Sequence, residues 1–300
     1  MQKTITLLAA LALALSCGKT PDTPQPTPEP KPDPSPVVQK LPINIGLGPI
    51  SKATDTAYEN GDVVGVWVVN NGSTLSNSGN NADNVAFSYD GSSWKSATQL
   101  YWKDETTSAS FYAYYPRVET VADVKAVPFS VKTNQSTLAG YKASALIWGN
   151  KLNVAPTTST VEIITYHRMS NLQVFVLPGD GYTEESMKAE GITVAINNLK
   201  VSASLNLETG EVTATGAASD ITPYLNGDHY QALVPPQSLQ DQTLVSLTVG
   251  DYSFTLKETI TLKSNTQHKV TLTVNKMSEG INIGIGQWET DDIDYGGTVN

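Results

Sequence analysis

The stretch Lys269-Val270-Thr271-Leu272-Thr273-Val274-Asn275 decides the fold class of this chain of 300 residues. Its aliphatic side chains fall on every second residue, and polar side chains fill the positions between them. Because successive side chains of a β-strand point to opposite faces, the stretch predicts a strand with one buried and one solvated face. Such strands are typical of antiparallel sheets with one face in water.

Outward from this stretch, the same alternation recurs along most of the chain, whereas helical periodicity is nearly missing. It is seen at Val64–Val68, Phe111–Tyr115, Leu172–Val176 and Val245–Val249. The sequence Glu208-Thr209-Gly210-Glu211 predicts a hairpin turn in which Gly210 takes the left-handed conformation. Only Thr183 to Glu190 suggests a short helix. The pattern therefore predicts an all-β protein.

The chain is long enough for two folded domains. Roughly 260 residues follow residue 40, which suits two domains of ordinary size better than one. The sequence Pro178-Gly179-Asp180-Gly181 breaks the strand pattern, and we place the domain boundary there. We expect two antiparallel β-sandwiches in tandem, residues 41–178 and 179–300.

The N-terminus predicts export. Lys3 precedes an apolar run, Ile5 to Leu15, that is too short to span a bilayer, and the only cysteine, Cys17, follows. A small residue before the cysteine is typical of a bacterial lipobox. Residues 1–17 therefore predict a lipoprotein signal peptide, with lipid attachment at Cys17. An ordinary signal peptide is the alternative.

Residues 18–40 predict a proline-rich linker. Proline occupies every second position from Pro24 to Pro36, and such a run favours extended polyproline II structure over helix or sheet. The linker would hold the folded part away from a lipid surface.

Composition argues against several classes of protein. The net charge is −10 and only two arginines occur, Arg117 and Arg168, so no basic surface for nucleic acid is expected. The loop Asn77–Asn84 and the acidic run Glu289–Asp294 contain oxygen ligands for calcium, but turn formation and a solvated tail explain them better. The three histidines lack the spacing of a metal site or a catalytic triad; they are His167, His229 and His268. We expect no enzymatic activity, no cofactor and no metal.

A six-residue sequence recurs near the two ends of the predicted folded part. Ile43-Asn44-Ile45-Gly46-Leu47-Gly48 and Ile281-Asn282-Ile283-Gly284-Ile285-Gly286 differ only at the fifth position. Each copy has three aliphatic side chains on one face and only Asn and Gly on the other. A strand of this kind suits a groove between sheets, where burial of three aliphatic side chains contributes on the order of 5–8 kcal/mol before entropy.

Two interpretations of the repeat stay open. In the first, the two copies fill the same groove in turn, with ladder hydrogen bonds along both of its edges, which is the strand addition used in pilin assembly. In the second, they are ordinary edge strands of two similar domains, and their glycines form bulges.

A set of short motifs resembles the fimbrillin family, the subunits of type V pili of Gram-negative anaerobes of the Bacteroides group. Each motif is weak alone, but their order and spacing along nearly the whole mature chain make the resemblance specific. They are Ala53 to Trp67, Trp102 followed by Phe111 to Pro116, Tyr166 to Leu172, Leu205 to Val212, Ala232 to Gln237, and Trp288 to Val299.

The resemblance implies two transthyretin-like sandwiches and export as a lipoprotein to the outer membrane and the fimbrium. It further implies that a trypsin-like protease removes the first strand, and that the vacated groove accepts a donor strand from the C-terminal region of a neighbouring subunit. Carried onto this chain, the removed strand is Leu41 to Ile50 and the donor includes Ile281 to Trp288. The groove would first hold Ile43, Ile45 and Leu47, and then Ile281, Ile283 and Ile285 of another copy.

The cleavage site departs from the family pattern. Arginine is the family's familiar cut point, yet none precedes Arg117, so the candidates are Lys52 and, less favoured, Lys40. If the first strand stays, the chain would be an accessory or anchor-like subunit held by Cys17 and its linker.

The sequence thus predicts a structural pilus subunit that supports adhesion. Its partners would be copies of itself or related subunits, the outer membrane through the lipid, and a ligand on a host or bacterial surface. The alternative is a non-polymerising surface lipoprotein that binds glycans through aromatic side chains such as Trp94 and Trp102. Tryptophans in a sandwich are more often packing residues.

Overall fold

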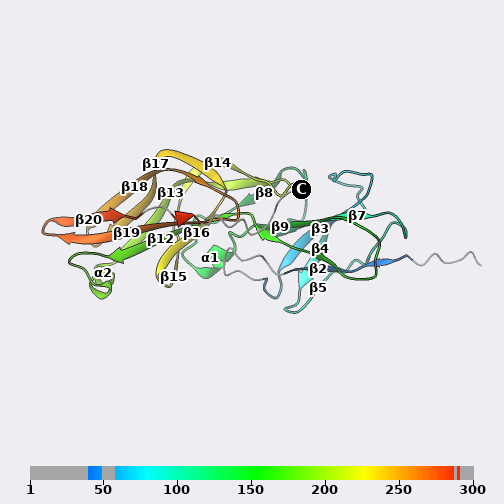
Figure 1. Cartoon of the computed structure of the whole chain (residues 1–300), viewed down its shortest axis with the longest axis horizontal. Coiled ribbons are helices and arrows are strands. Elements are labelled where there is room, and N and C mark those ends of the chain that lie inside the picture. Colours follow the sequence, from blue (N-terminus) through cyan, green and yellow to red (C-terminus); the bar gives the residue numbers. More distant parts are fainter. Residues whose placement is uncertain (1–39, 49–57, 287–288, 291–300) are drawn as a thin grey trace, which may run out of the picture. The chain divides into compact units, whose positions relative to one another are not determined.

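Strands make up nearly all of the regular structure in the computed structural model, which describes residues 40–48, 58–286 and 289–290 (Figure 1). Two short helices, α1 (Leu138–Lys142) and α2 (Glu184–Glu190), complete the elements of these ranges. The all-β prediction is confirmed, and so is the helix expected from Thr183, whose hydroxyl caps α2. Cys17 and Lys52 lie outside the described residues, so the predictions made for them stay predictions.

The first half of the described chain forms one large sheet and two small ones. The large sheet has the order β11-β9-β7-β3-β4-β5, and the small ones are β1-β6 and β10-β2. The strands are β1 (Pro42–Ile43), β2 (Ile45–Leu47), β3 (Val63–Asn70), β4 (Ala82–Tyr89), β5 (Trp94–Lys95), β6 (Leu100–Tyr101), β7 (Ala109–Tyr115), β9 (Ile147–Val154), β10 (Val161–Ile163) and β11 (Tyr166–His167).

Strand β3 is buried on both faces. Val64, Val66 and Val68 pack in a core cluster with the strands β1, β2, β6 and β10, whereas Trp67 and Val69 belong to a second cluster that continues into the rest of the chain. A strand covered on both faces needs apolar residues at every position, which explains why its sequence is almost continuously apolar. The large sheet is therefore a shared layer between two cores.

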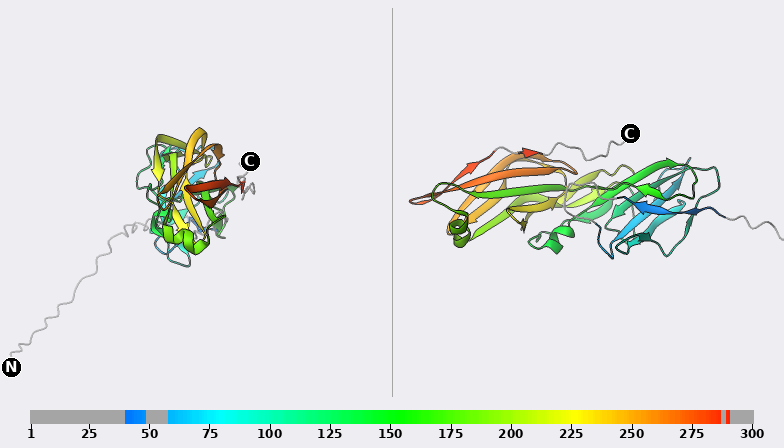
Figure 2. Two further views of the ribbon diagram at one scale, coloured as in Figure 1. Left: turned by 90° about the vertical axis from the view of Figure 1, so that its left-hand side faces the viewer. Right: turned by 60° about the horizontal axis from the view of Figure 1, so that its bottom comes forward.

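The second half builds two sheets that face each other across the second cluster (Figure 2). One has the order β15-β16-β12-β19-β20 with β21 also on β19; the other has the order β14-β13-β17-β18 with β8 on β13. Their strands are β8 (Val127–Ser130), β12 (Ser170–Pro178), β13 (Ile192–Leu205), β14 (Val212–Ile221), β15 (Tyr224–Asn226), β16 (His229–Val234), β17 (Gln237–Val249), β18 (Tyr252–Leu262), β19 (Gln267–Met277), β20 (Gly280–Ile285) and β21 (Glu289–Thr290).

The strand that decided the fold class is β19, and its buried face is as predicted. Val270, Leu272 and Val274 are fully buried, and the residues between them are half-buried. Its neighbours are not all antiparallel, however, because β19 runs parallel to β12 over eight paired residues and antiparallel to β20. The antiparallel pairing expected for this strand therefore holds for β20 and not for β12. Alternation reports which face is buried; it favours an antiparallel sheet but does not fix the direction of each neighbouring strand.

The strand before the expected domain boundary pairs with strands that follow it. β12 ends at Pro178 and hydrogen-bonds to both β16 and β19, so residues 170–178, assigned above to the first sandwich, lie in a sheet of the second half. The proline and glycines that follow end a strand, and a strand end need not be a domain end. The described residues from Lys40 onward belong to one compact unit, and the division into two domains stays a prediction.

Trp148 of β9 connects the two halves through the predicted hairpin. Its indole nitrogen donates to the carbonyl oxygen of Leu207 (2.8 Å), and its ring lies against Gly210, which has the expected left-handed φ of 72°. Any side chain at Gly210 would meet the indole ring.

Within the described ranges, neither helix is long and apolar enough to cross a membrane.

Candidate functional site

The first copy of the repeat fills a groove in the first half of the protein. Ile43, Ile45 and Leu47 are 4%, 8% and 9% exposed and pack into the cluster formed with β3, β6, β7 and β10. The other face of the segment, Asn44 and Gly46, is turned outward. We call Leu41 to Gly48 the leading strand; the predicted burial of its three aliphatic side chains is confirmed.

Each part of the leading strand hydrogen-bonds to only one edge of the groove, and the two parts use different edges. Its first part, β1, pairs antiparallel with β6, and the amide of Trp102 donates to the carbonyl of Leu41 (2.9 Å). Its second part, β2, pairs parallel with β10, where the amide of Gly48 donates to the carbonyl of Ile163 (2.9 Å). We expected ladders along both edges throughout; instead the strand changes partner at Asn44.

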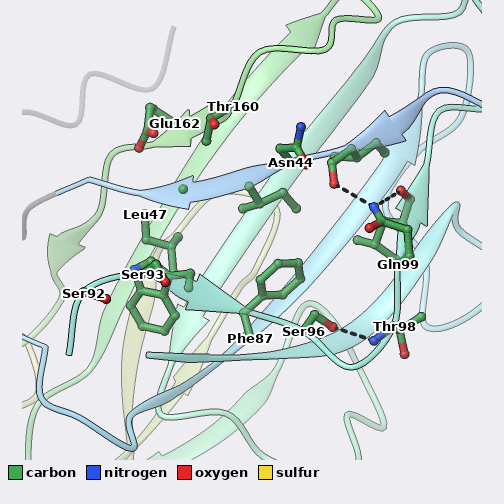
Figure 3. A pocket seen from close by; sticks show the side chains of 15 residues that line it. Asn44, Leu47, Phe87, Ser92, Ser93, Ser96, Thr98, Gln99, Thr160 and Glu162 are labelled. Atoms are coloured by element: carbon green, nitrogen blue, oxygen red, sulfur yellow. Dashed lines mark hydrogen bonds between the residues drawn. The ribbon is translucent and has the colours of Figure 1, made fainter. Parts of the chain in front are cut away.

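A hollow of about 510 Å³ lies along β2, and its lining includes Thr160 and Glu162 on the side of β10 (Figure 3). Leu47 and Phe87 lie toward its floor, and hydroxyl-bearing residues of the segment from Ser92 to Thr98 form its rim. The side-chain amide of Gln99 bridges part of the gap by donating to the carbonyl of Ile43 (3.3 Å). In the described part of the chain, β10 is the only strand paired with β2, so the edge of β2 opposite β10 has no strand partner.

The rim of this hollow is fixed by Asp90. Its carboxylate pairs with the Lys95 ammonium (2.5 Å) and accepts hydrogen bonds from the amides of Ser92 (3.0 Å) and Ser93 (2.7 Å). These partners, the ammonium first, hold the pKa of Asp90 well below its usual range. The turn that bounds the groove on this side therefore stays closed by a charged carboxylate.

The second copy of the repeat, here called the trailing strand (Gly280–Gly286), lies in a different sheet. β20 is the edge strand on β19, and Ile281 and Ile283 are half-buried against the larger core cluster. Ile285 is 49% exposed, although its counterpart Leu47 is 9% exposed. The same sequence pattern thus lies in a closed groove at one place and at a sheet edge at the other.

The groove depends on residues that the sequence did not single out. Leu100 lies opposite Ile43, Val161 lies opposite Ile45, and the carbonyl of Thr158 accepts from the Asn44 side chain (3.0 Å). These partners lie more than fifty residues beyond the leading strand. The aliphatic alternation of Val161 and Ile163 was the one signal that marked part of this wall.

Of the two candidate cleavage sites, only Lys40 is among the described residues, and it is exposed directly before the leading strand. Cleavage there would leave the leading strand attached to the protein. Cleavage at Lys52 would separate it from the residues that form the groove.

The two tryptophans of the glycan-binding alternative are packing residues to different degrees. Trp102 is 2% exposed, lies edge-on to Phe111 at 5.6 Å, and donates its indole nitrogen to the Thr157 carbonyl (3.1 Å). Trp94 is half-buried, edge-on to Tyr58 at 4.8 Å, and lines the hollow. Trp102 therefore belongs to the core, as is usual for tryptophan in a sandwich.

The three histidines do not come together. His167 is paired in β11, His229 in β16 and His268 in β19, and no group of three metal-ligating side chains exists among the residues that the structure describes. His167 is 1% exposed, and this burial lowers its pKa to about 4. Beside it, the guanidinium of Arg168 lies 4.6 Å from the centre of the Trp148 ring. Both His167 and Arg168 lie at the junction of the two halves of the protein.

The buried His167 should make the protein less stable in weak acid. Its pKa is lowered on folding, so the imidazole is neutral in both states above pH 6.5, and stability is lost as the pH falls from about 6.5 toward about 4. We expect a loss of about 3 kcal/mol over this window, after which the contribution is constant. Urea unfolding between pH 4 and pH 8 measures it. His167→Asn should lose this part of the slope, whereas His229→Asn should keep it; parallel profiles for wild type and His167→Asn would refute the assignment.

The fold and the site define a class of protein. It is an all-β protein in which a short aliphatic strand is bound in a groove and a second strand of the same pattern lies at a sheet edge. Residues 51–288 match the model of a family described as fimbrillin-like, which is more than half of the chain. The chain belongs to this family.

Two curated relatives are similar in sequence. A Bacteroides uniformis protein named as fimbrium subunit Fim1C is 26% identical over 258 residues, with 83% of this chain and 80% of that protein covered. A Bacteroides ovatus protein named as fimbrium tip subunit Fim1C is 27% identical over 205 residues; the match covers 61% of this chain and about a third (35%) of that relative.

Solved structures share the fold. A crystal structure described as a cell adhesion protein from Bacteroides uniformis superposes with a TM-score of 0.64 at 19% identity, covering 85% of this chain and 99% of that one. A second one from Bacteroides ovatus, described in the same words, gives a TM-score of 0.64 at 14% identity, covering 84% and 97%. At these identities the comparison supports the fold alone.

Proposed function

We propose that this chain is a structural subunit of a cell-surface pilus, and that it assembles when the trailing strand of one copy replaces the leading strand in the groove of another. One observation carries the proposal. The leading strand buries Ile43, Ile45 and Leu47 in the groove, and the trailing strand carries the same pattern at an edge, where Ile285 is half in water.

Exchange between these two strands is energetically reasonable. Each presents three aliphatic side chains, so the apolar contribution of one, on the order of 5–8 kcal/mol, is replaced by a similar contribution of the other. The main-chain bonds to β6 and β10 are sequence-independent and re-form with either strand. Transfer of Ile285 from a half-exposed position into the groove adds apolar burial that this residue lacks in its own sheet.

The similarity to related proteins supports the structural role in a pilus and the location on the cell surface. Family membership and the similarity to proteins named as fimbrium subunits favour a position on the cell surface within a fimbrium. We further propose that Cys17 carries a lipid, that residues 18–40 lift the fold from the outer membrane, and that cleavage at Lys52 frees the leading strand. Other copies of this chain or related subunits are the partners, and adhesion is the role of the fibre. The proposed role is structural and involves no catalysis.

Limited trypsin digestion of the purified protein tests this function. We expect a clean N-terminal cut that removes Leu41 to Lys52, followed by oligomers that resist SDS. N-terminal sequencing of the product identifies the cut, and sedimentation measures assembly. A protein that is cut at Lys52, loses the leading strand and stays monomeric would refute strand exchange; affinity of that monomer for glycans would favour the adhesin alternative.

A further inference from the structure

Asn44 lies where the leading strand changes its pairing partner. Residues before it pair with β6, and residues after it pair with β10. Its own carbonyl accepts a hydrogen bond from the amide of Val161 (2.8 Å), and its side-chain amide donates to the carbonyl of Thr158 (3.0 Å). The Asn44 side chain thus bonds the strand to the loop that precedes β10.

The bond to Thr158 depends on the residue type at this position. The bonds made by the backbone of the leading strand would form with almost any sequence, whereas this one requires a side chain that donates hydrogen from the correct distance. An aspartate of the same shape accepts only, and alanine has no polar atom. Asn44 therefore distinguishes the correct register of the strand from neighbouring ones.

In the trailing strand, only one residue could take the position that Asn44 has in the groove. A shift of one residue would turn its aliphatic side chains out of the groove, so only shifts of two residues compete. The residues at the outward positions are Gly280, Asn282, Gly284 and Gly286, and only Asn282 has a side chain that can donate. In its own sheet Asn282 is exposed on the edge strand, opposite Asn275.

We propose that Asn282 sets the register of the trailing strand in the groove of a second copy, by donating its side-chain amide to the Thr158 carbonyl as Asn44 does within one chain. This inference rests on the proposed function. It makes Asn282 a specificity-determining residue of assembly. With Asn282 bound there, Ile281, Ile283 and Ile285 occupy the positions of Ile43, Ile45 and Leu47.

Because the two strands compete for one groove, the same substitution has opposite effects in the two copies of the repeat. Asn44→Ala weakens the leading strand and favours its release, while Asn282→Ala weakens the trailing strand and opposes assembly. A neutral hydrogen bond of this kind changes an equilibrium by about twofold to tenfold. Two ordinary edge strands would show no such opposition.

The test uses the full-length chain, cut with trypsin and kept in one sample with the cleaved leading strand so that the two strands compete, and it measures the critical concentration for assembly by sedimentation. We expect a critical concentration about twofold to tenfold lower for Asn44→Ala than for wild type, and higher by a similar factor for Asn282→Ala and for the isosteric Asn282→Asp. The midpoint of thermal unfolding of the uncut subunits should be unchanged in both Asn282 variants, because Asn282 is exposed on the edge of its own sheet.

The outcomes separate this inference from the proposed function. If wild type assembles and Asn282→Ala and Asn282→Asp assemble equally well, strand exchange stands and the register role of Asn282 is overturned. Equal impairment of the Asn44 and Asn282 variants also overturns it, since competition demands opposite signs. If the cut wild-type protein does not assemble, the proposed function fails and this inference fails with it.

Discussion

Replacement of Ile285 by aspartate is expected to abolish fibre assembly while the subunit stays folded. In the free subunit Ile285 is 49% exposed at the end of the edge strand β20, so a carboxylate there remains in water. In the groove of a second copy it would occupy the place of Leu47, which is 9% exposed and packed in an apolar cluster. Burial of an unpaired carboxylate costs several kcal/mol, more than a hundredfold in affinity.

The matched control is Met277→Asp. Met277 lies on the same hairpin, is 56% exposed and falls outside the repeat, so the substitution adds the same new charge to the hairpin without changing the trailing strand. After trypsin cleavage, electron microscopy and sedimentation should show fibres for wild type and Met277→Asp and monomers for Ile285→Asp, with similar thermal midpoints for all three. Fibres of normal length from Ile285→Asp would show that the trailing strand does not enter the groove.

How far the sequence predicts the fold can be judged from β19 and β12. The alternation at Val270, Leu272 and Val274 correctly assigned the buried face, because burial is a local property of a period-two pattern. The parallel pairing of β19 with β12 joins segments almost a hundred residues apart, and nothing in either stretch specifies the direction of its neighbour. The same limitation applies to the boundary expected after Pro178, since this proline and the glycines after it signal only where a strand ends, whereas β12 pairs with the later strands β16 and β19.

The candidate site shows the same division between what is local and what is not. The repeat, its aliphatic face and the burial of its first copy could be predicted from twelve residues of sequence. The groove could not, because its walls come from the segments around Leu100 and Val161, which the chain brings together only in three dimensions. Thr158 contributes a backbone carbonyl, and any residue supplies a carbonyl, so no sequence pattern marks this contact.

Replacement of Ile45 by aspartate is expected to have the opposite result and to allow assembly without proteolysis. Ile45 lies at the centre of the leading strand, is 8% exposed, and pairs with Val161 of β10. The substitution removes about 2 kcal/mol of apolar burial and adds the cost of an unpaired charge in the groove. Together these offset most of the contribution of the three aliphatic side chains, so the leading strand should leave the groove although it remains attached to the chain.

Sedimentation of uncut protein measures this effect. The uncut wild type should stay monomeric and uncut Ile45→Asp should form fibres, because an attached leading strand that no longer binds cannot exclude the trailing strand of a neighbour. The double variant Ile45→Asp with Ile285→Asp should be monomeric again. Ile164→Asp is the control, since Ile164 lies beside Gly48 and is 52% exposed, so a charge there should leave the groove closed.

The double variant is decisive because it separates exchange from aggregation. A groove opened by Ile45→Asp exposes an apolar cluster, and such a surface also promotes disordered association. Association of that kind would not depend on Ile285, a half-exposed residue of a different sheet. If the double variant assembles as well as Ile45→Asp does, the material is an aggregate. The leading strand would then be an ordinary structural strand of its own subunit, with no part in exchange. If assembly is lost, the opened groove binds the trailing strand through the aliphatic side chain of Ile285, as it binds the leading strand through Leu47.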